Sequence, residues 1–271
     1  QIVSGIAELC SFYKKTVILY DIQGSAIEKG LANIARSLER LVKKEKISEE
    51  KKQETLSRIS TTIRLEDLSK SDFIIEAATE NETIKFELFQ KLSSLVHENT
   101  LLASNTSSIS ITSLASKVKH PERVIGMHFM NPVPVMKLIE IIKGLQTSLE
   151  TYEQVKLLAE TMGKITITSE DRPGFVVNRI LMPMINEAIY ALMEGVGQPS
   201  DIDTGMKLGT NHPMGPLELA DFIGLDTCLS IMDVLHRGLG DTKYRACPLL
   251  RNYVSAGWLG RKIGRGFYKY E

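Results

Sequence analysis

Two ionisable residues interrupt apolar stretches near the middle of the sequence. His128 ends the run at residues 124–128, and Glu140 is the one charged residue within residues 138–142. A lone histidine in an apolar run is more often structural, but a buried carboxylate costs free energy unless it is paired. Two prolines lie between the stretches and can redirect the chain. We therefore predict that the second stretch returns along the first and brings Glu140 to His128.

A histidine–carboxylate pair of this kind can move a proton. Histidine titrates near neutral pH and can accept the hydroxyl proton of a secondary alcohol as a hydride leaves the carbon. A carboxylate on its other ring nitrogen selects the tautomer and stabilises the imidazolium. A nicotinamide cofactor would take the hydride, so this chemistry needs no metal. The pair therefore indicates alcohol oxidation or its reverse.

Polar residues also follow two strand-like runs. Asp21 comes directly after the β-branched run at residues 16–20, and Ser104-Asn-Thr-Ser-Ser108 follows the run at residues 101–104. In a doubly wound sheet, ligands bind at the carboxyl ends of the strands. Asp21 could bind ribose hydroxyls and repel a 2′-phosphate, which favours NAD over NADP. An acid after a strand is also a common chance event, and small polar residues make ordinary turns.

The glycine-rich turn of a dinucleotide site is expected just before that first run. Residues 1–7 lie where the end of a GxGxxG turn and its following helix would be, with Val3 at the third glycine position. We expect the first strand and the first two glycines to precede residue 1. The third glycine allows close packing of helix on strand, so we expect Val3 to push the helix away and weaken dinucleotide binding.

Strands and helices are expected to alternate through the first part of the chain. Strand-like runs occur at residues 16–21, 73–76, 101–104, 124–128, 137–142 and 165–167, and helical spacing occurs at residues 4–13, 25–46, 84–96 and 151–162. This alternation implies βαβ units. We predict an α/β fold with a doubly wound, mostly parallel, Rossmann-type sheet whose N-terminal strand is missing from this chain.

The pattern of strand-like and helical segments changes after Asp171. Pro173-Gly174 marks a turn, and beyond it helical patterns occupy residues 176–193, 200–208, 216–224 and 226–239. We predict two domains, a dinucleotide-binding domain at residues 1–171 and an all-helical domain at residues 172–271.

Composition excludes several classes of protein. The 33 basic residues balance the 33 acidic ones, so no basic face favours nucleic acid as a partner. No apolar run approaches the ~18 residues of a membrane span. The three cysteines are scattered, which predicts free thiols rather than a disulfide framework or a metal site. We expect a cytoplasmic protein, or one of an organelle matrix if a targeting signal precedes residue 1.

Five motifs, in this order, resemble the 3-hydroxyacyl-CoA dehydrogenase family, including its 3-hydroxybutyryl-CoA branch. They are Ser104-Asn-Thr-Ser-Ser108, Gly126-Met-His-Phe-Met-Asn-Pro132, Pro173-Gly-Phe-Val-Val-Asn-Arg179, His212-Pro-Met-Gly-Pro216 and Gly264-Arg-Gly-Phe-Tyr268. The resemblance covers essentially the whole chain. It implies NAD-dependent oxidation of (S)-3-hydroxyacyl-CoA, with a weak preference for short chains such as 3-hydroxybutyryl-CoA.

The resemblance also implies roles for particular residues. His128 would be the general base and Glu140 its orienting partner, while Ser107 and Asn178 would hydrogen-bond the 3-oxygen of the substrate. The positions that match cofactor contacts are Asp21, Glu80, Lys85, Ser107, Asn131 and Lys262. Ser37 and Lys44 match contacts to the CoA part of the acyl-CoA substrate, although Lys44 on a charged helix is also explained as a solvated side chain. The helical domain would form a homodimer and close over the substrate.

Two alternatives stay open. The first is a non-catalytic, CoA-binding relative whose dinucleotide binding is impaired at the N-terminus. The second is a 3-hydroxyisobutyrate- or 6-phosphogluconate-type dehydrogenase. Those enzymes rely on a lysine base, and the histidine–glutamate pair argues against them.

Overall fold

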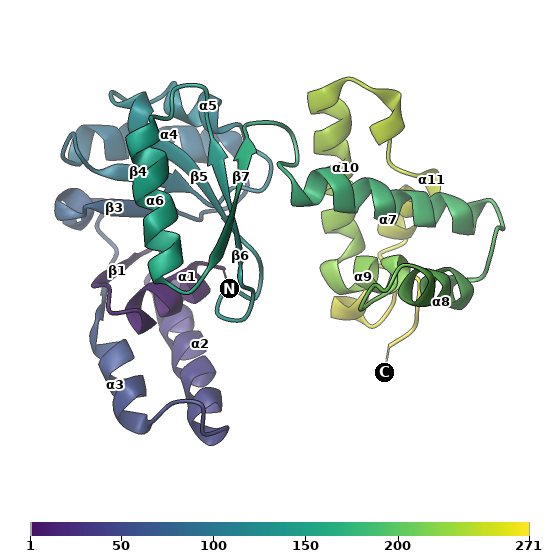
Figure 1. The fold of residues 1–271 in the computed structure, drawn as a ribbon, viewed down its shortest axis with the longest axis horizontal. Coiled ribbons are helices and arrows are strands. Elements are labelled where there is room, and N and C mark those ends of the chain that lie inside the picture. The colour runs from purple at the N-terminus through teal and green to yellow at the C-terminus, as the bar shows by residue number, and fades with distance from the viewer. Residues whose placement is uncertain (1, 271) are drawn as a thin grey trace. The chain divides into compact units, whose positions relative to one another are not determined.

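The computed structural model describes residues 2–270. The chain divides between Asp171 and Arg172 into two compact units, the first built from strands and helices and the second from helices (Figure 1). The helices of the second unit enclose an apolar core of their own. Among residues 2–270, no helix combines the length and the apolar character that a membrane span requires.

Within residues 2–171, the first unit holds seven strands and six α-helices. In chain order these are α1 (Ile2–Phe12), β1 (Val17–Tyr20), α2 (Gly24–Lys43), α3 (Glu49–Ser57), β2 (Ile59–Thr62), β3 (Phe73–Glu76), α4 (Glu82–Leu95), β4 (Leu101–Ser104), α5 (Ile111–Ala115), β5 (Val124–Phe129), β6 (Leu138–Lys143), α6 (Leu149–Thr161) and β7 (Ile165–Glu170). The second unit holds α7 (Val177–Met193), α8 (Pro199–Gly209), α9 (Pro216–Ile223), α10 (Leu225–Leu239) and α11 (Pro248–Ser255).

The strands form two sheets. Strands β3 to β7 make a five-stranded sheet in sequential order, and β1 pairs with β2 in a two-stranded parallel sheet. Within the larger sheet only the β5–β6 pair is antiparallel. The predicted α/β class and mostly parallel sheet are confirmed.

Side chains alternate between the two faces of the larger sheet. Met127, Ile139 and Ile141 point to a face where they pack with residues of α1 and α6, and α6 lies across this sheet in Figure 1. Gly126 and Ile142 point to the opposite face, toward Ile111 of α5. A Cβ on Gly126 would lie 2.7 Å from the Cβ of Ile142, so only glycine permits this close approach. Alternation places His128 and Glu140 on this second face as well.

The N-terminal helix packs against β1 and α2 through apolar side chains. Val3 packs against an apolar cluster that includes Leu19 of β1 and Ile27 and Ile34 of α2. Val3 is thus accommodated in the packing of α1 beside β1 and α2. Part of the room comes from α2, which turns Gly30 toward Leu19.

The long second helix is shorter than predicted. It ends at Lys43, with Lys44 as its C-cap, whereas the sequence pattern extended it to residue 46. Glu45 adopts a positive φ of 54°, and the chain turns back so that Ile47 packs against the same apolar cluster. The helix therefore ends inside a charged run, where the chain turns back and Ile47 becomes partly buried.

Candidate active site

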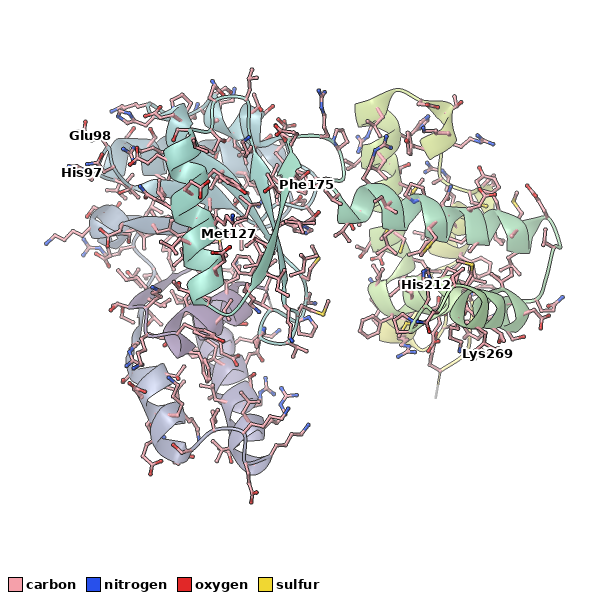
Figure 2. All side chains as sticks on the ribbon, viewed as in Figure 1. His97, Glu98, Met127, Phe175, His212 and Lys269 are labelled. Atoms are coloured by element: carbon pink, nitrogen blue, oxygen red, sulfur yellow. The ribbon has the colours of Figure 1, made fainter. Side chains whose placement is uncertain are left out.

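The antiparallel pairing of β5 with β6 brings the predicted histidine and glutamate together. His128 lies directly opposite Glu140 in the register, and directly opposed residues project from the same face of a sheet. His128 Nδ1 donates to Glu140 Oε2 at 2.7 Å. Glu140 is fully buried and His128 is 8% exposed. Met127, which precedes His128 on β5, is labelled in Figure 2.

A buried lysine holds the turn that makes this pairing possible. Lys164, just before β7, donates from Nζ to the carbonyl oxygens of Val133 at 2.6 Å and Met136 at 2.7 Å. Burial lowers the pKa of Lys164. The amide nitrogens of Val135 and Met136 both donate to the Pro132 carbonyl. The turn is thus tied both to itself and to the neighbouring strand, which keeps β5 and β6 in register.

The pair has the geometry of a proton-transfer site. Because the carboxylate engages Nδ1, exchange of a proton with a bound alcohol must use Nε2. A carboxylate in a dry environment strongly stabilises a positive charge on the ring. The arrangement can therefore take a proton from a hydroxyl and return it to an alkoxide.

A second cluster lies after β3 and β4 and contains two of the predicted cofactor residues. Glu80 Oε1 accepts from the backbone nitrogens of Ser107 at 2.9 Å and Ser108 at 3.0 Å. It also accepts from the hydroxyls of Thr106, Ser107 and Ser108. Burial alone would raise the pKa of Glu80, but the hydrogen bonds from Thr106 and Ser108 and the charge of Lys85 lower it. Glu80 is therefore an anion that holds the Ser107 turn in place.

Lys85, also predicted as a cofactor residue, lies under this cluster. Its side chain is 1% exposed, and Nζ pairs with Glu76 at 2.6 Å and with Glu80 at 3.7 Å. A further contact ties this region to β5, because Asn105 Oδ1 accepts from the Phe129 nitrogen at 2.8 Å. The turn after β4 and the strand that carries His128 are thus joined directly.

The donor set at these strand ends suits a dinucleotide. Asp21 follows β1 and accepts from the Gln23 nitrogen at 2.9 Å, and Asn131 is exposed shortly after β5. Together with Glu80 and Ser107, these side chains offer carboxylate, hydroxyl and amide groups after β1, β3, β4 and β5. Such groups match ribose hydroxyls and a carboxamide, and strand carboxyl ends are where dinucleotides bind in α/β sheets.

The positions matched to CoA contacts lie on and after α2. Lys44 is exposed. Ser37 is partly buried, and its hydroxyl donates to Glu8 Oε1 at 2.8 Å. Glu8 is 4% exposed. Burial raises its pKa from 4.5 to about 7, against the opposing effects of the Ser37 hydrogen bond and the Arg40 charge.

Replacing Glu8 with glutamine should therefore stabilise the fold at high pH. The folded protein binds the Glu8 proton more tightly than the unfolded chain does. The stability that protonated Glu8 contributes is therefore full below pH 4.5, and it is lost as the pH rises through about 7. We expect Glu8→Gln to raise the unfolding free energy by about 1–3 kcal/mol at pH 8 and to leave it nearly unchanged near pH 4. Urea unfolding at both pH values measures the difference. Glu28→Gln, at an exposed position of α2, should change neither, and an equal gain from Glu8→Gln at both pH values would contradict the assignment.

Two predicted site residues belong to the second unit. Asn178 lies in the first turn of α7 and is partly buried. Lys262 lies in the short helix Arg261–Ile263, and its Nζ pairs with both oxygens of Asp226 at 2.6 Å.

Glu76 and Lys164 were missed from the sequence. Glu76 ends the apolar run Phe73–Glu76, and the reasoning that singled out Glu140 applies to it equally. Lys164 precedes a strand-like run without any pattern to distinguish it, because its two acceptors are backbone carbonyls of a distant turn.

Two family models match the chain. The model for the 3-hydroxyacyl-CoA dehydrogenase NAD-binding domain matches residues 1–172, and the model for the 3-hydroxyacyl-CoA dehydrogenase C-terminal domain matches residues 174–270. The first match confirms the prediction of NAD as the cofactor.

Individual relatives match this chain over all or nearly all of its length. The chain is 56% identical to a probable 3-hydroxybutyryl-CoA dehydrogenase of Bacillus subtilis, over 100% of this chain and 94% of the relative. It is 53% identical to the 3-hydroxybutyryl-CoA dehydrogenase of Bradyrhizobium diazoefficiens, over 100% of this chain and 92% of the relative. The crystal structure of (S)-3-hydroxybutyryl-CoA dehydrogenase from Ralstonia eutropha superposes with a TM-score of 0.96 at 52% identity, covering 99% of this chain and 95% of that one. The chain therefore belongs to the 3-hydroxyacyl-CoA dehydrogenase family.

Proposed function

We propose that this protein catalyses the NAD-dependent oxidation of (S)-3-hydroxybutyryl-CoA to acetoacetyl-CoA, and the reverse reduction. The observation that carries the proposal is the His128 Nδ1–Glu140 Oε2 contact of 2.7 Å on paired, buried strands. The substrate follows the names of the relatives from Bacillus subtilis, Bradyrhizobium diazoefficiens and Ralstonia eutropha. These names do not favour a non-catalytic CoA-binding role.

His128 would act as the general base. Nε2 takes the proton of the 3-hydroxyl, while Nδ1 keeps its hydrogen bond to Glu140, which stabilises the imidazolium that forms. NAD, when bound, accepts the hydride from C3 of the substrate. In the reverse direction, the imidazolium returns the proton to the 3-oxygen. Ser107 and Asn178 would donate hydrogen bonds to that oxygen and so hold the reacting carbon in place.

The remaining predicted residues would bind the rest of the two ligands. Asp21 would accept from ribose hydroxyls and repel a 2′-phosphate, while Glu80, Lys85, Asn131 and Lys262 would complete the cofactor contacts. Ser37 and Lys44 would lie along the CoA part of the substrate, where the charge of an exposed lysine favours phosphate groups.

The proposal is tested by following NADH absorbance with acetoacetyl-CoA as substrate. We expect saturable NADH consumption, formation of the (S)-alcohol, and much weaker activity with NADPH because of the Asp21 charge. Calorimetric titration with NADH should accompany the assay. Saturable NADH binding without any turnover of acetoacetyl-CoA would overturn the proposal and favour a non-catalytic role.

We also propose that the protein forms a homodimer through one face of α7. A cavity of about 730 Å³ lies along this helix, lined by residues that include Arg179, Glu187, Tyr190, Glu194 and Arg245. Arg179 Nη1 and the Tyr190 hydroxyl are buried, and neither finds a hydrogen-bond partner among residues 2–270. Buried polar atoms normally have partners, and a face that carries both signs of charge can pair with itself about a two-fold axis.

Reversing one charge on this face should weaken the dimer. Glu187→Arg places a further cation among the arginines, so a self-pairing face would meet like charge. Light scattering coupled to gel filtration should report a dimer for the unmodified protein and a shift toward monomer for Glu187→Arg. Glu153→Arg, at an exposed position of α6, is the matched control. A monomeric unmodified protein, or a Glu187→Arg dimer of unchanged stability, would contradict this interface.

A further inference from the structure

A buried carboxylate at the end of β3 has no part in the mechanism described above. The side chain of Glu76 is 1% exposed. Its Oε1 accepts from Lys85 Nζ at 2.6 Å and from the Ala78 nitrogen at 2.6 Å, and its Oε2 accepts from the Ser104 hydroxyl at 2.6 Å. Both carboxylate oxygens are therefore engaged, each by a different segment of the chain.

Lys85 extends this contact toward the surface. Its Nζ donates to Glu76 and to the Ala78 carbonyl at 3.1 Å, and it lies 3.7 Å from Glu80 Oε2. An ammonium group that is taken out of water requires compensating charge. Buried Glu76 supplies that charge, and the ammonium group in turn faces the more exposed Glu80. Among residues 2–270, the other groups that contact Lys85 Nζ are Glu80 and the Ala78 carbonyl, so without Glu76 these two alone would hold Lys85 in this position.

Two routes of contact then converge on the turn that carries Ser107. Along the first, Lys85 faces Glu80, and Glu80 accepts from the nitrogens of Ser107 and Ser108. Along the second, the Ser104 hydroxyl donates to Glu76 and accepts from the Thr106 nitrogen at 3.2 Å. The segment after β3 and the segment after β4 are thereby held by one carboxylate.

We propose that Glu76 is a positioning residue for the Ser107 turn and for Glu80. Its charge orients Lys85 and Ser104, and these fix the turn at residues 104–108 relative to the segment after β3. Residues that orient ligand-contacting groups must themselves be locked in place for the site to keep its geometry. The roles of Ser107 and Glu80 in binding rest on the proposed function, whereas the positioning of the turn itself does not.

Glu76→Gln tests this directly, because it removes the charge and nearly preserves the volume. We expect hydrogen–deuterium exchange of the peptide spanning residues 104–110 to become about tenfold faster, since the amides of Ser107 and Ser108 lose a well-oriented acceptor. We expect the dissociation constant for NADH, from fluorescence titration, to rise by about tenfold for the same reason. Glu76→Asp, which keeps the charge, should recover part of both losses.

A matched control lies at the other end of the same strands. The Thr100 hydroxyl, also buried, donates to the Ser71 carbonyl at 2.9 Å just before β4. Thr100→Val removes this hydrogen bond, and we expect it to lower stability without changing exchange at residues 104–110 or the affinity for NADH. If Glu76→Gln behaves like Thr100→Val, losing stability alone, Glu76 is only structural and the proposal is overturned.

A double variant covers the case in which Glu76→Gln does not fold. Glu76→Gln combined with Lys85→Met removes both buried charges, a replacement that proteins often tolerate. The folded double variant should still show fast exchange at residues 104–110, because Glu80 has lost Lys85 and Ser104 has lost its carboxylate. Exchange as slow as in the unmodified protein would overturn the proposal. These outcomes do not depend on turnover, so a protein inactive toward acetoacetyl-CoA would reject the proposed function and leave this test intact.

Discussion

Replacing His128 with glutamine is expected to lower kcat for acetoacetyl-CoA reduction by about a thousandfold. Glutamine can donate a hydrogen bond but cannot carry a proton between pH 5 and 9, and a positioned acid or base contributes about 10²- to 10⁴-fold to a rate. The carboxylate of Glu140 would lose the ring it faces at 2.7 Å. The affinity for NADH should change little, because His128 acts on the substrate. Steady-state rates from NADH absorbance, with NADH binding measured separately, provide the comparison.

The chain offers a matched control for this substitution. His120 also faces a carboxylate, with Nδ1 3.3 Å from Glu122 Oε1, but both side chains are about half exposed. His120→Gln removes a histidine–glutamate contact of the same chemical type at the surface, and should leave kcat within about twofold, since exposed pairs of this kind contribute little. Equal losses from the two substitutions would assign the effect of His128→Gln to general damage.

Glu140→Gln should give the second-largest loss, about a hundredfold or more in kcat. The amide has nearly the same shape, but it cannot stabilise the imidazolium and it permits the wrong tautomer of His128. In serine hydrolases, the corresponding change from carboxylate to amide slows the reaction by about 10⁴-fold. The effect should appear in kcat with little change in the dissociation constant for NADH. Activity within about threefold of the unmodified protein would exclude an electrostatic role for Glu140.

The stability of the Glu140→Gln protein tests whether its lower kcat comes from lost proton-transfer chemistry rather than from a disturbed fold. Glu140 is fully buried, and exchanging its charge for an amide removes a desolvation cost while keeping an acceptor for His128. We expect the Glu140→Gln protein to unfold at no lower urea concentration than the unmodified one. A large loss of stability would instead make the lower rate a consequence of a disturbed sheet.

The contact between His128 and Glu140 could be predicted because it obeys a simple rule. A charge inside an apolar strand needs a partner, and the antiparallel return of β6 along β5 supplies one. The same rule would have identified Glu76 at the end of β3. The difference lies in the partner, since Lys85 sits on the charged helix α4, where a lysine is ordinarily a solvated side chain.

Elements without an apolar pattern could not be predicted. Strand β2 reads Ile-Ser-Thr-Thr, with a single apolar residue, and it forms because it pairs in register with β1. Helix α3 has almost no apolar face. It is held by the Ser48 cap and by Lys52, which pairs with Glu39 of α2 at 2.6 Å. Both depend on contacts with residues elsewhere in the chain.

In the polar part of the site, too, one feature could be predicted from the sequence and another could not. The turn at residues 104–108 was visible as a candidate because of its composition, but its attachment to Glu80 could not be read from the sequence. Five hydrogen bonds to one carboxylate oxygen require the ends of β3 and β4 to be adjacent. That adjacency is a property of the parallel pairing of these strands.

The central claim is that His128 and Glu140 act as one unit in proton transfer, and a double-mutant cycle on kcat tests it most directly. Residues that act as a unit show strongly non-additive losses. With acetoacetyl-CoA and saturating NADH, the His128→Gln/Glu140→Gln double variant should be within about threefold of His128→Gln alone, because Glu140 has no imidazolium left to stabilise. A double variant slowed by the product of the two single losses would show that the residues act independently, and would contradict this account.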